Sequence, residues 1–299
     1  MATTHELTVD ANTIALWHMN GTVGSAGKKD NAEGTAAYDI SETGTPTTGN
    51  GFDGASNGNY TFDGSSNYCT VADASGLRPS SVTVEIWFKA TNTNTGTPQH
   101  LIDKGDGSGD YDIFIGSSNT LNFRVRTNST DRTVSAAFSD TTSWHYAVLT
   151  YGSEVLKGYL DGMQFGSDVS APGTYNTTTS NISFGASSSG VQKLAGSVDE
   201  CRISNTVRSA NDISDYYNAA FRVTVLDTFT TSDPTFSSLR QVVTTVLDTF
   251  ITSDIFSGIK SLITTILDSF TTSDQDTVSK SWTADQKTDA ETWTKDTRH

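Results

Sequence analysis

Acidic side chains are the groups in this chain best suited to catalysis, and their spacing limits what they can do. Hydrolysis of a sugar bond needs two carboxylates that flank it. Glu85 stands in the apolar segment 82–88 with no acidic residue two or five positions further on. Asp199 and Glu200 are adjacent, so in a strand they would point to opposite faces. The sequence therefore predicts no glycosidase, and we expect a protein that is not an enzyme.

The histidines and cysteines give no catalytic pattern. His18 and His145 each follow a tryptophan in a predicted strand, and the sequence has no Gly-x-Ser-x-Gly motif and no Cys/His spacing typical of zinc. Cys69 and Cys201 stand where strands would carry core valines. Two buried free thiols that act as small apolar side chains are one interpretation of this pair.

One loop has the composition of a calcium site. The segment 103–112 reads Asp-Lys-Gly-Asp-Gly-Ser-Gly-Asp-Tyr-Asp, and its oxygen atoms are of the kind that calcium prefers. The alternative is a solvated hairpin turn rich in glycine and aspartate, and we favour this second interpretation.

These residues are spread over short segments that predict a mainly β protein. Trp144, Tyr146 and Val148 alternate with His145, Ala147 and Leu149, and Asp161-Gly162 is a strong hairpin signal. Many short strands with frequent turns are typical of a two-sheet antiparallel sandwich. A short helix is expected after the last strand, opened by Ser209 as a capping residue. The predicted strands are 13–19, 60–63, 68–71, 81–90, 99–104, 111–116, 120–126, 133–138, 144–150, 155–160, 182–185 and 194–203.

Several of these segments carry a family resemblance. The pattern of Trp144-His145 opening a strand and Asp161-Gly162 closing its partner resembles the laminin-G-like members of the concanavalin A-like lectin and glucanase superfamily. Residues 60–71, 82–89 and 196–204 are similar to that family's early, central and last strands. The resemblance covers roughly residues 10 to 220 and implies a jelly-roll sandwich for a first domain, 1–221. Carbohydrate binding is the activity that such a lectin-like fold implies.

The resemblance also implies particular sites. It suggests a structural Ca²⁺ ion near the first and last strands, held by Asn20, Asp30 and Asp199. It places Cys69 and Cys201 on strands that lie close together, which makes a disulfide the alternative to free thiols. Five side chains fall near the family's sugar-binding places, although most aromatic residues of a sandwich belong to its core. They are Tyr111, Phe114, Phe123, Arg124 and Arg126.

Composition changes near residue 221, where a second domain, 222–299, is expected. A Leu-Asp-(Thr/Ser)-Phe-x-Thr-Ser-Asp motif recurs there three times at intervals of about 20 residues. Between copies the apolar residues follow the spacing of an amphipathic helix, so we favour helices over the strands that its Thr, Val and Ile content would suggest. β-branched residues on a helical seam favour more than two chains, which predicts a trimer formed through 222–299. The alternative is a monomeric helical array.

Charge narrows the choice of partners. The net charge is −15 and the isoelectric point is near 4.5, which argues against nucleic acids and anionic membranes as partners. The N-terminus shows neither a basic start nor an apolar segment of a secretory signal. We therefore expect a virion protein, a fibre or capsid decoration that contacts other virion proteins and surface glycans. The alternatives are a secreted or cell-surface adhesin and an accessory carbohydrate-binding module of a larger enzyme.

Overall fold

The computed structural model describes residues 6–20, 38–105 and 109–220. The chain divides into two compact units, Met1–Thr224 and Val225–His299. The predicted tail of residues 222–299, with its repeats, lies outside the described residues. All the described residues belong to the first unit.

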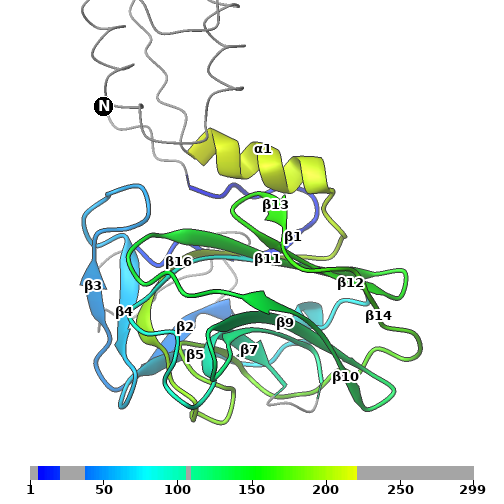
Figure 1. The fold of residues 1–299 in the computed structure, drawn as a ribbon, viewed down its shortest axis with the longest axis horizontal. Helices are drawn as coiled ribbons and strands as arrows, with labels where there is room; N and C mark the ends of the chain where they lie inside the picture. Colours follow the sequence, from blue (N-terminus) through cyan, green and yellow to red (C-terminus); the bar gives the residue numbers. More distant parts are fainter. Residues whose placement is uncertain (1–5, 21–37, 106–108, 221–299) are drawn as a thin grey trace, which may run out of the picture. The chain divides into compact units, whose positions relative to one another are not determined.

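The first unit is a sandwich of two antiparallel sheets (Figure 1). The nine-stranded sheet has the order β13-β12-β11-β6-β16-β4-β3, with β1 also paired to β16 and β14 to β12. The seven-stranded sheet has the order β10-β9-β8-β7-β15-β5-β2. The strands of the first sheet are β1 (Thr13–Trp17), β3 (Thr47–Gly49), β4 (Asn59–Asp63), β6 (Val82–Ala90), β11 (His145–Gly152), β12 (Val155–Leu160), β13 (Met163–Gln164), β14 (Val169–Ser170) and β16 (Ala195–Ser204). Those of the second are β2 (Ile40–Thr43), β5 (Tyr68–Val71), β7 (Gln99–Lys104), β8 (Tyr111–Ile115), β9 (Thr120–Thr127), β10 (Thr130–Ala137) and β15 (Ile182–Phe184).

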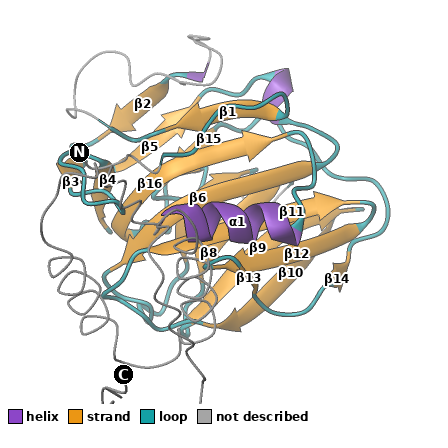
Figure 2. Ribbon diagram, turned by 90° about the horizontal axis from the view of Figure 1, so that it is seen from above, coloured by secondary structure: helices purple, strands orange, loops and turns teal. Residues whose placement is uncertain are grey.

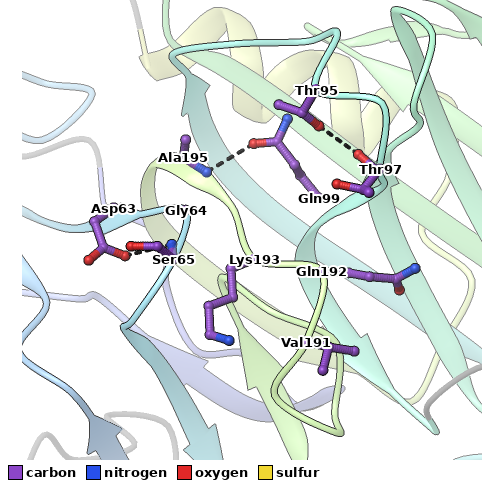
Figure 3. Close-up of a pocket in the computed structure, with 10 residues that line it drawn as sticks. All are labelled: Asp63, Gly64, Ser65, Thr95, Thr97, Gln99, Val191, Gln192, Lys193 and Ala195. Atoms are coloured by element: carbon purple, nitrogen blue, oxygen red, sulfur yellow. Dashed lines mark hydrogen bonds between the residues drawn. The ribbon is translucent and has the colours of Figure 1, made fainter.

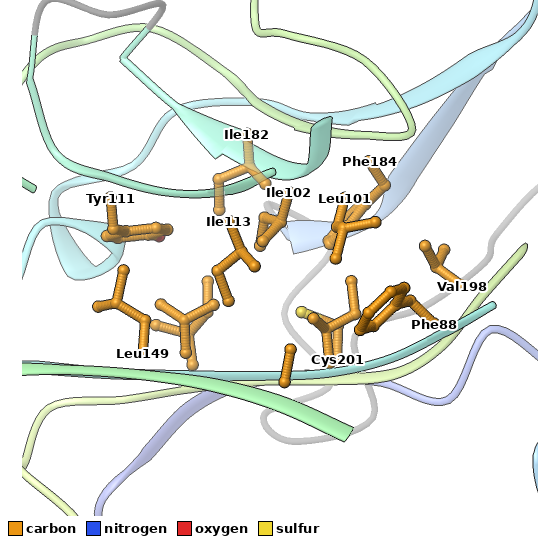
Figure 4. Packing of buried hydrophobic residues seen from close by; sticks show 14 of the residues in the cluster. Phe88, Leu101, Ile102, Tyr111, Ile113, Leu149, Ile182, Phe184, Val198 and Cys201 are labelled. Carbon is orange, nitrogen blue, oxygen red and sulfur yellow. The ribbon is translucent and has the colours of Figure 1, made fainter. Parts of the chain in front are cut away.

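The hydrophobic core fills the space between the sheets (Figure 4). In β6, Val84, Ile86 and Phe88 belong to this core, while Glu85 and Trp87 between them point to the opposite face, as the two-residue period of a strand requires. Ile113 and Phe184 come from the facing sheet. This alternation leaves each sheet with an outer face whose covering must come from elsewhere.

Helix α1 (Ala210–Ala220) covers the outer face of the nine-stranded sheet (Figures 1 and 2). Its first turn is closed by a reciprocal cap: the Asp212 amide donates to Ser209 Oγ at 3.1 Å, and the Ser209 amide donates to Asp212 Oδ2 at 3.0 Å. Beneath the helix, Trp87 stacks on Phe52 with ring centroids 4.2 Å apart and on Tyr217 at 5.9 Å. The predicted helix and its capping residue Ser209 are confirmed.

Glu85, the lone acid of the central strand, has a structural role on this covered face. Arg202 donates from Nε and Nη2 to its two carboxylate oxygens at 2.6 and 2.7 Å, and Tyr146 donates its hydroxyl proton to the same group. Both charged side chains are buried. Their ion pair fixes β16 against β6, which are neighbouring strands.

The prediction of a mainly β sandwich is confirmed, and several strands have the expected ends. Segments 68–71, 99–104 and 155–160 are strands with the predicted bounds. The short strands β2, β3, β13 and β14 were not predicted. They contain two to four residues each and are partly or fully exposed at most positions, so they carry little apolar signal. A 3-10 turn, Ser75–Leu77, completes the described elements.

The disulfide that the resemblance suggested is not formed. Cys69 lies on β5 of the seven-stranded sheet and Cys201 on β16 of the nine-stranded sheet, and both are buried and outside any disulfide. Each belongs to the core between the sheets, where burial raises the pKa of the Cys201 thiol well above its ordinary value. The alternative of two small apolar side chains describes this pair.

Candidate functional site

A pocket of about 350 Å³ opens where three loops gather at one end of the sandwich (Figure 3). The loops are the turn between β4 and β5, the connection from β6 to β7, and the connection from β15 to β16. Most of the side chains in the lining are polar. The lining residues are Asp63, Gly64, Ser65, Thr95, Thr97, Gln99, Val191, Gln192, Lys193 and Ala195.

Hydrogen bonds within the protein fix the positions of these polar groups. Gln99 is buried and held at both ends of its amide: Nε2 donates to the Asn92 carbonyl at 2.7 Å, and Oε1 accepts from the Ala195 amide at 2.9 Å. Thr95 donates its hydroxyl proton to the Thr97 carbonyl at 2.7 Å (Figure 3). The loop walls are therefore positioned before any ligand arrives.

Gln192 and Lys193 form one wall of the pocket. Gln192 is exposed and has a positive φ of 51°, a conformation that costs free energy in a residue with a long side chain. Lys193 donates from Nζ to the Gly190 carbonyl and lies over the Tyr68 ring, 5.6 Å from its centroid. A residue in a left-handed conformation and a half-buried cation thus stand side by side at one rim of the pocket.

The pocket adjoins a polar cluster on the outer face of the seven-stranded sheet. His100 Nε2 lies 2.9 Å from Gln192 Oε1, and His100 Nδ1 lies 2.9 Å from Asp112 Oδ1. Arg124 donates to Asp112 Oδ2 at 2.6 Å, and its guanidinium lies 5.1 Å from the centre of the Phe114 ring. Gln192 thus links the loop pocket to a cationic and aromatic surface on the sheet.

Asp103 belongs to the same cluster and is buried beside another acid. It lies directly opposite Asp112 on the neighbouring strand. Burial, together with the charge of Asp112, raises the pKa of Asp103 to about 6. The His100 ring loses solvation on burial, but the charge and hydrogen bond of Asp112 outweigh this loss and raise the pKa of His100 above its ordinary value.

The five predicted sugar contacts divide between the core and the surface. Tyr111 and Phe123 are buried in the core between the sheets, so for these two the core alternative describes the structure. Phe114, Arg124 and Arg126 lie on the outer face and are half-buried. Phe114 stacks on His100, and His100 bonds to Gln192 of the pocket wall. These contacts place Phe114 and Arg124 beside the pocket.

The interpretation of segment 103–112 as a solvated turn is wrong for the residues at its two ends. Asp103, Asp110 and Asp112 are all buried, and Lys104 between them is fully buried as well. Lys104 donates to Asp73 Oδ1 at 2.7 Å and lies 3.7 Å from Asp110 Oδ2. Lys104, Asp110 and Asp112 therefore lie in ion pairs inside the fold, which composition alone did not show.

The implied calcium site can be compared with the residues that the structure describes. Asn20 donates from its side-chain amide to Glu6 Oε1 at 2.7 Å, and Asp30 lies outside the described residues. Asp199 is buried and accepts from the Phe52 amide, while its Oδ1 has no hydrogen-bond partner among the described residues. That orphaned oxygen fits a ligand role for Asp199. The three-residue calcium set itself stays a prediction.

Asp199 and Glu200 are separated by local backbone geometry. The pairing of β16 with β6 shifts register between Asp199 and Arg202, and Glu200 has a positive φ of 43°. Glu200 turns toward β1, where His18 Nδ1 lies 2.6 Å from its carboxylate. His145 likewise meets an acid, with Nδ1 2.7 Å from Asp161 Oδ2. Both histidines lie in structural ion pairs with neighbouring elements.

Sequence reasoning missed most of the pocket. Thr97, Gln192 and Lys193 lie in connections that the sequence marks only as turns. The clusters of Gly, Ser, Thr and Asn in segments 91–98 and 185–193 were a signal of two long connections, one between β6 and β7 and the other between β15 and β16. That signal marks loops, and it cannot show that they meet.

The pocket lies within a segment that matches a known protein family. A family model described as the concanavalin A-like lectin/glucanases superfamily matches residues 63–214, just over half of the chain. The chain belongs to this superfamily. The match includes the outer-face cluster and all the pocket residues, from Asp63 to Ala195. Comparison with curated proteins finds no match.

Solved structures with the same fold include receptor-binding domains of toxins. The binding domain of botulinum neurotoxin mosaic serotype C/D has a TM-score of 0.56 at 14% identity over 71% of this chain and 51% of that chain. The serotype D binding domain gives 0.55 at 11% identity over 69% and 51%, and the DC binding domain in complex with rat synaptotagmin II gives 0.54 at 11% over 71% and 52%. This chain spans about half the length of these structures. At such identities the likeness shows the fold alone.

Proposed function

We propose that this superfamily domain is a non-enzymatic carbohydrate-binding module and that the loop pocket is its binding site. The observation that carries the proposal is the pocket of about 350 Å³ lined by hydroxyl, amide, carboxylate and ammonium groups. Sugars present many hydroxyl groups, and a site recognises them through precisely placed polar partners. Amides and hydroxyls act as both donors and acceptors, which matches the dual character of a sugar hydroxyl.

Preorganisation of the walls supports the same proposal. Gln99 and Thr95 are already fixed by the protein, so ordering them costs little when a ligand binds. Lys193 adds a cation beside Tyr68. One solved structure of the same fold belongs to botulinum neurotoxin type C, whose cell entry depends upon interaction with two ganglioside molecules. Cell-surface glycans are therefore the first ligands to test.

Burial of the acids on the neighbouring face supports a binding role without hydrolysis. Asp103 and Asp112 are opposite each other on neighbouring strands, but they are only 1% and 3% exposed. A carboxylate pair that cleaves a sugar bond must reach that bond. A glycan that binds the pocket is therefore expected to be recovered intact, and release of reducing sugar during incubation would contradict this part of the proposal.

The setting we propose is a virus particle, where the module would attach a fibre or capsid decoration to host glycans. The three repeats in residues 222–299 support an oligomeric stalk, with a trimer favoured. Among the described residues, α1 is neither long nor apolar enough to span a membrane. Native mass spectrometry of the full chain is expected to give a three-chain mass, and labelled antibody is expected to decorate intact particles. A monomeric mass would contradict the stalk, and unlabelled particles would favour the adhesin alternative.

The binding site is tested with the full chain on a glycan array. Lys193→Ala and Gln192→Ala are expected to weaken binding about tenfold, which corresponds to the loss of roughly 1.4 kcal/mol. Lys157→Ala is the matched control, because Lys157 lies on β12 and pairs with Asp168, and neither residue lines the pocket. An array without any bound glycan, or equal weakening by Lys157→Ala, would contradict the proposal.

A further inference from the structure

Three ligand-type side chains converge on the outer face of the seven-stranded sheet. His100 and Asp103 come from β7 and Asp112 from β8, and all three are buried. One nitrogen or oxygen atom of each lies within 4.8 Å of the corresponding atoms of the other two. The segment between β15 and β16 lies over them, because Ser188 and Gln192 both bond to the cluster.

The hydrogen bonds of His100 define which ring nitrogen faces the acids. Nε2 lies 2.9 Å from Gln192 Oε1, a carbonyl oxygen that can only accept, so Nε2 carries a hydrogen atom. Nδ1 then points at Asp112 Oδ1, 2.9 Å away. A nitrogen lone pair cannot approach a carboxylate oxygen this closely, so without a metal ion a proton on Nδ1 bridges the pair. An ion bound at about 2.0–2.2 Å in a tetrahedral arrangement would replace this proton and hold the two atoms slightly further apart.

Each carboxylate is held from behind by a second donor. Arg124 donates to Asp112 Oδ2 at 2.6 Å, and the Ser188 amide donates to Asp103 Oδ2 at 2.7 Å. This leaves Oδ1 of each acid for the centre of the cluster. Asp103 Oδ1 is buried and has no hydrogen-bond partner among the described residues. At metal centres, the side chains that bind the ion are typically oriented by hydrogen bonds from other protein groups, which are called outer partners here.

A proton satisfies only part of this arrangement. On Nδ1 it would bridge His100 and Asp112 and leave Asp103 Oδ1 without a partner, which is costly for a buried acid. Asp103 and Asp112 also repel, because they are directly opposite on adjacent strands. A divalent ion would give all three atoms a partner, and its two positive charges would by themselves offset the charges of both acids.

We propose that His100, Asp103 and Asp112 form a binding site for a divalent transition metal ion, with Zn²⁺ as the best-fitting ion. One imidazole and two carboxylates are ligands that zinc accepts at about 2.0–2.2 Å in a tetrahedral arrangement, which leaves a fourth position for water. Calcium and magnesium fit less well, because they prefer six or more oxygen ligands. The site is separate from the predicted calcium ligands and does not depend on glycan binding.

A second cluster in the chain provides a matched control. Glu6, His18 and Glu200 have the same composition of one imidazole and two carboxylates, also within 4.8 Å. There the oxygen atoms are satisfied by the protein: Glu200 bonds His18 and the Leu7 amide, and Glu6 accepts from Asn20. With no orphaned atom, this cluster lacks the feature on which the proposal rests.

The experiment measures zinc binding by the full chain. Isothermal titration with ZnCl₂ and elemental analysis after gel filtration are expected to give one tight Zn²⁺ site. His100→Gln and Asp103→Asn should each weaken it more than about 100-fold, beyond the usual effect of changing an outer partner. Glu6→Gln should leave it unchanged. Circular dichroism and thermal unfolding without zinc establish that each variant is folded.

Cobalt substitution gives a second measurement that needs no variant to fold. Co²⁺ bound to the unmodified chain should give the intense visible absorption of a four-coordinate site with nitrogen and oxygen ligands, and Zn²⁺ should displace it. Three results would overturn the proposal. These are absence of tight zinc binding, zinc binding that survives both His100→Gln and Asp103→Asn, and loss of zinc binding in Glu6→Gln.

Discussion

The outer faces of the two sheets differ in how they are covered. On the nine-stranded sheet, α1 lies across the outer surface (Figure 2). It encloses an aromatic cluster that includes Trp87, Tyr146 and Tyr159. On the seven-stranded sheet, the segment between β15 and β16 covers only a polar group around His100 and Asp112. Beyond it, Phe114 and Arg124 remain half-exposed. One face is closed by apolar packing, and the other by hydrogen bonds between polar side chains.

This difference indicates where stability and function lie. Burial of aromatic surface stabilises a fold without requiring exact geometry. A buried polar cluster contributes little net stability, because each group gives up water before it gains a partner. A protein that keeps such a cluster beside a pocket is retaining it at some cost in stability. The helix-covered face is therefore the main source of packing stability, and the polar face is the one on which the proposed sites lie.

The largest expected effect is on the helix-covered face. Trp87→Ala removes the ring that stacks on Phe52 and Tyr217 and should lower the free energy of unfolding by about 3–5 kcal/mol. Chemical denaturation of the full chain measures this loss. Val191→Ala, at an exposed position on the pocket rim, serves as the control and should change stability by less than about 0.5 kcal/mol. Equal free energies of unfolding for Trp87→Ala and Val191→Ala would contradict the view that packing on the helix-covered face stabilises the fold.

The ion pair under the same helix should be nearly as sensitive. Arg202→Met leaves Glu85 buried without its bidentate partner and should cost roughly 3 kcal/mol. The double variant Glu85→Leu with Arg202→Met removes both charges and should recover most of the loss. Thermal unfolding of the three proteins tests this. If the double variant melts at as low a temperature as Arg202→Met, the two side chains stabilise the fold by more than balancing each other's charge.

A smaller effect is expected on the polar face. Phe114→Leu removes the stacking on His100 and the contact with Arg124 and should cost about 1 kcal/mol. Ser135→Ala, exposed on β10 of the same sheet, is the control. A loss above about 3 kcal/mol, measured by chemical denaturation, would mean that this face is also held together by packing.

The smallest effect concerns pH. Burial disfavours the charged form of His145, but Asp161 and Asp140 outweigh it and raise the pKa of His145 above its usual 6.5. A raised pKa in the folded state stabilises the protein below the unfolded pKa, and this stabilisation is lost as pH rises through the folded value. The difference in melting temperature between the unmodified chain and His145→Asn should therefore shrink from pH 5.5 to pH 9. If the difference in melting temperature does not change with pH, His145 stabilises the protein by packing and not through its charge.

The candidate site shows why sequence patterns stop short of function. His100 and Asp103 are three residues apart, so in a regular strand they would point to opposite faces. A register shift between His100 and Ile102 places both on the outer face, opposite Phe114 and Asp112. No alternation in the sequence reveals this irregularity, because a bulge depends on how the neighbouring strand pairs.

Sequence alone determined the local elements of this protein. Short apolar segments bounded by turn signals specified the strands 99–104 and 155–160, and Ser209 with Asp212 specified the start of α1, because these preferences act between residues close in the chain. Tertiary structure decided which distant residues meet. It placed Cys69 and Cys201 on opposite sheets, and it brought residues 63–65, 95–99 and 191–195 together around one pocket. Such meetings depend on strand order and register, which form only when the whole sandwich closes around its core.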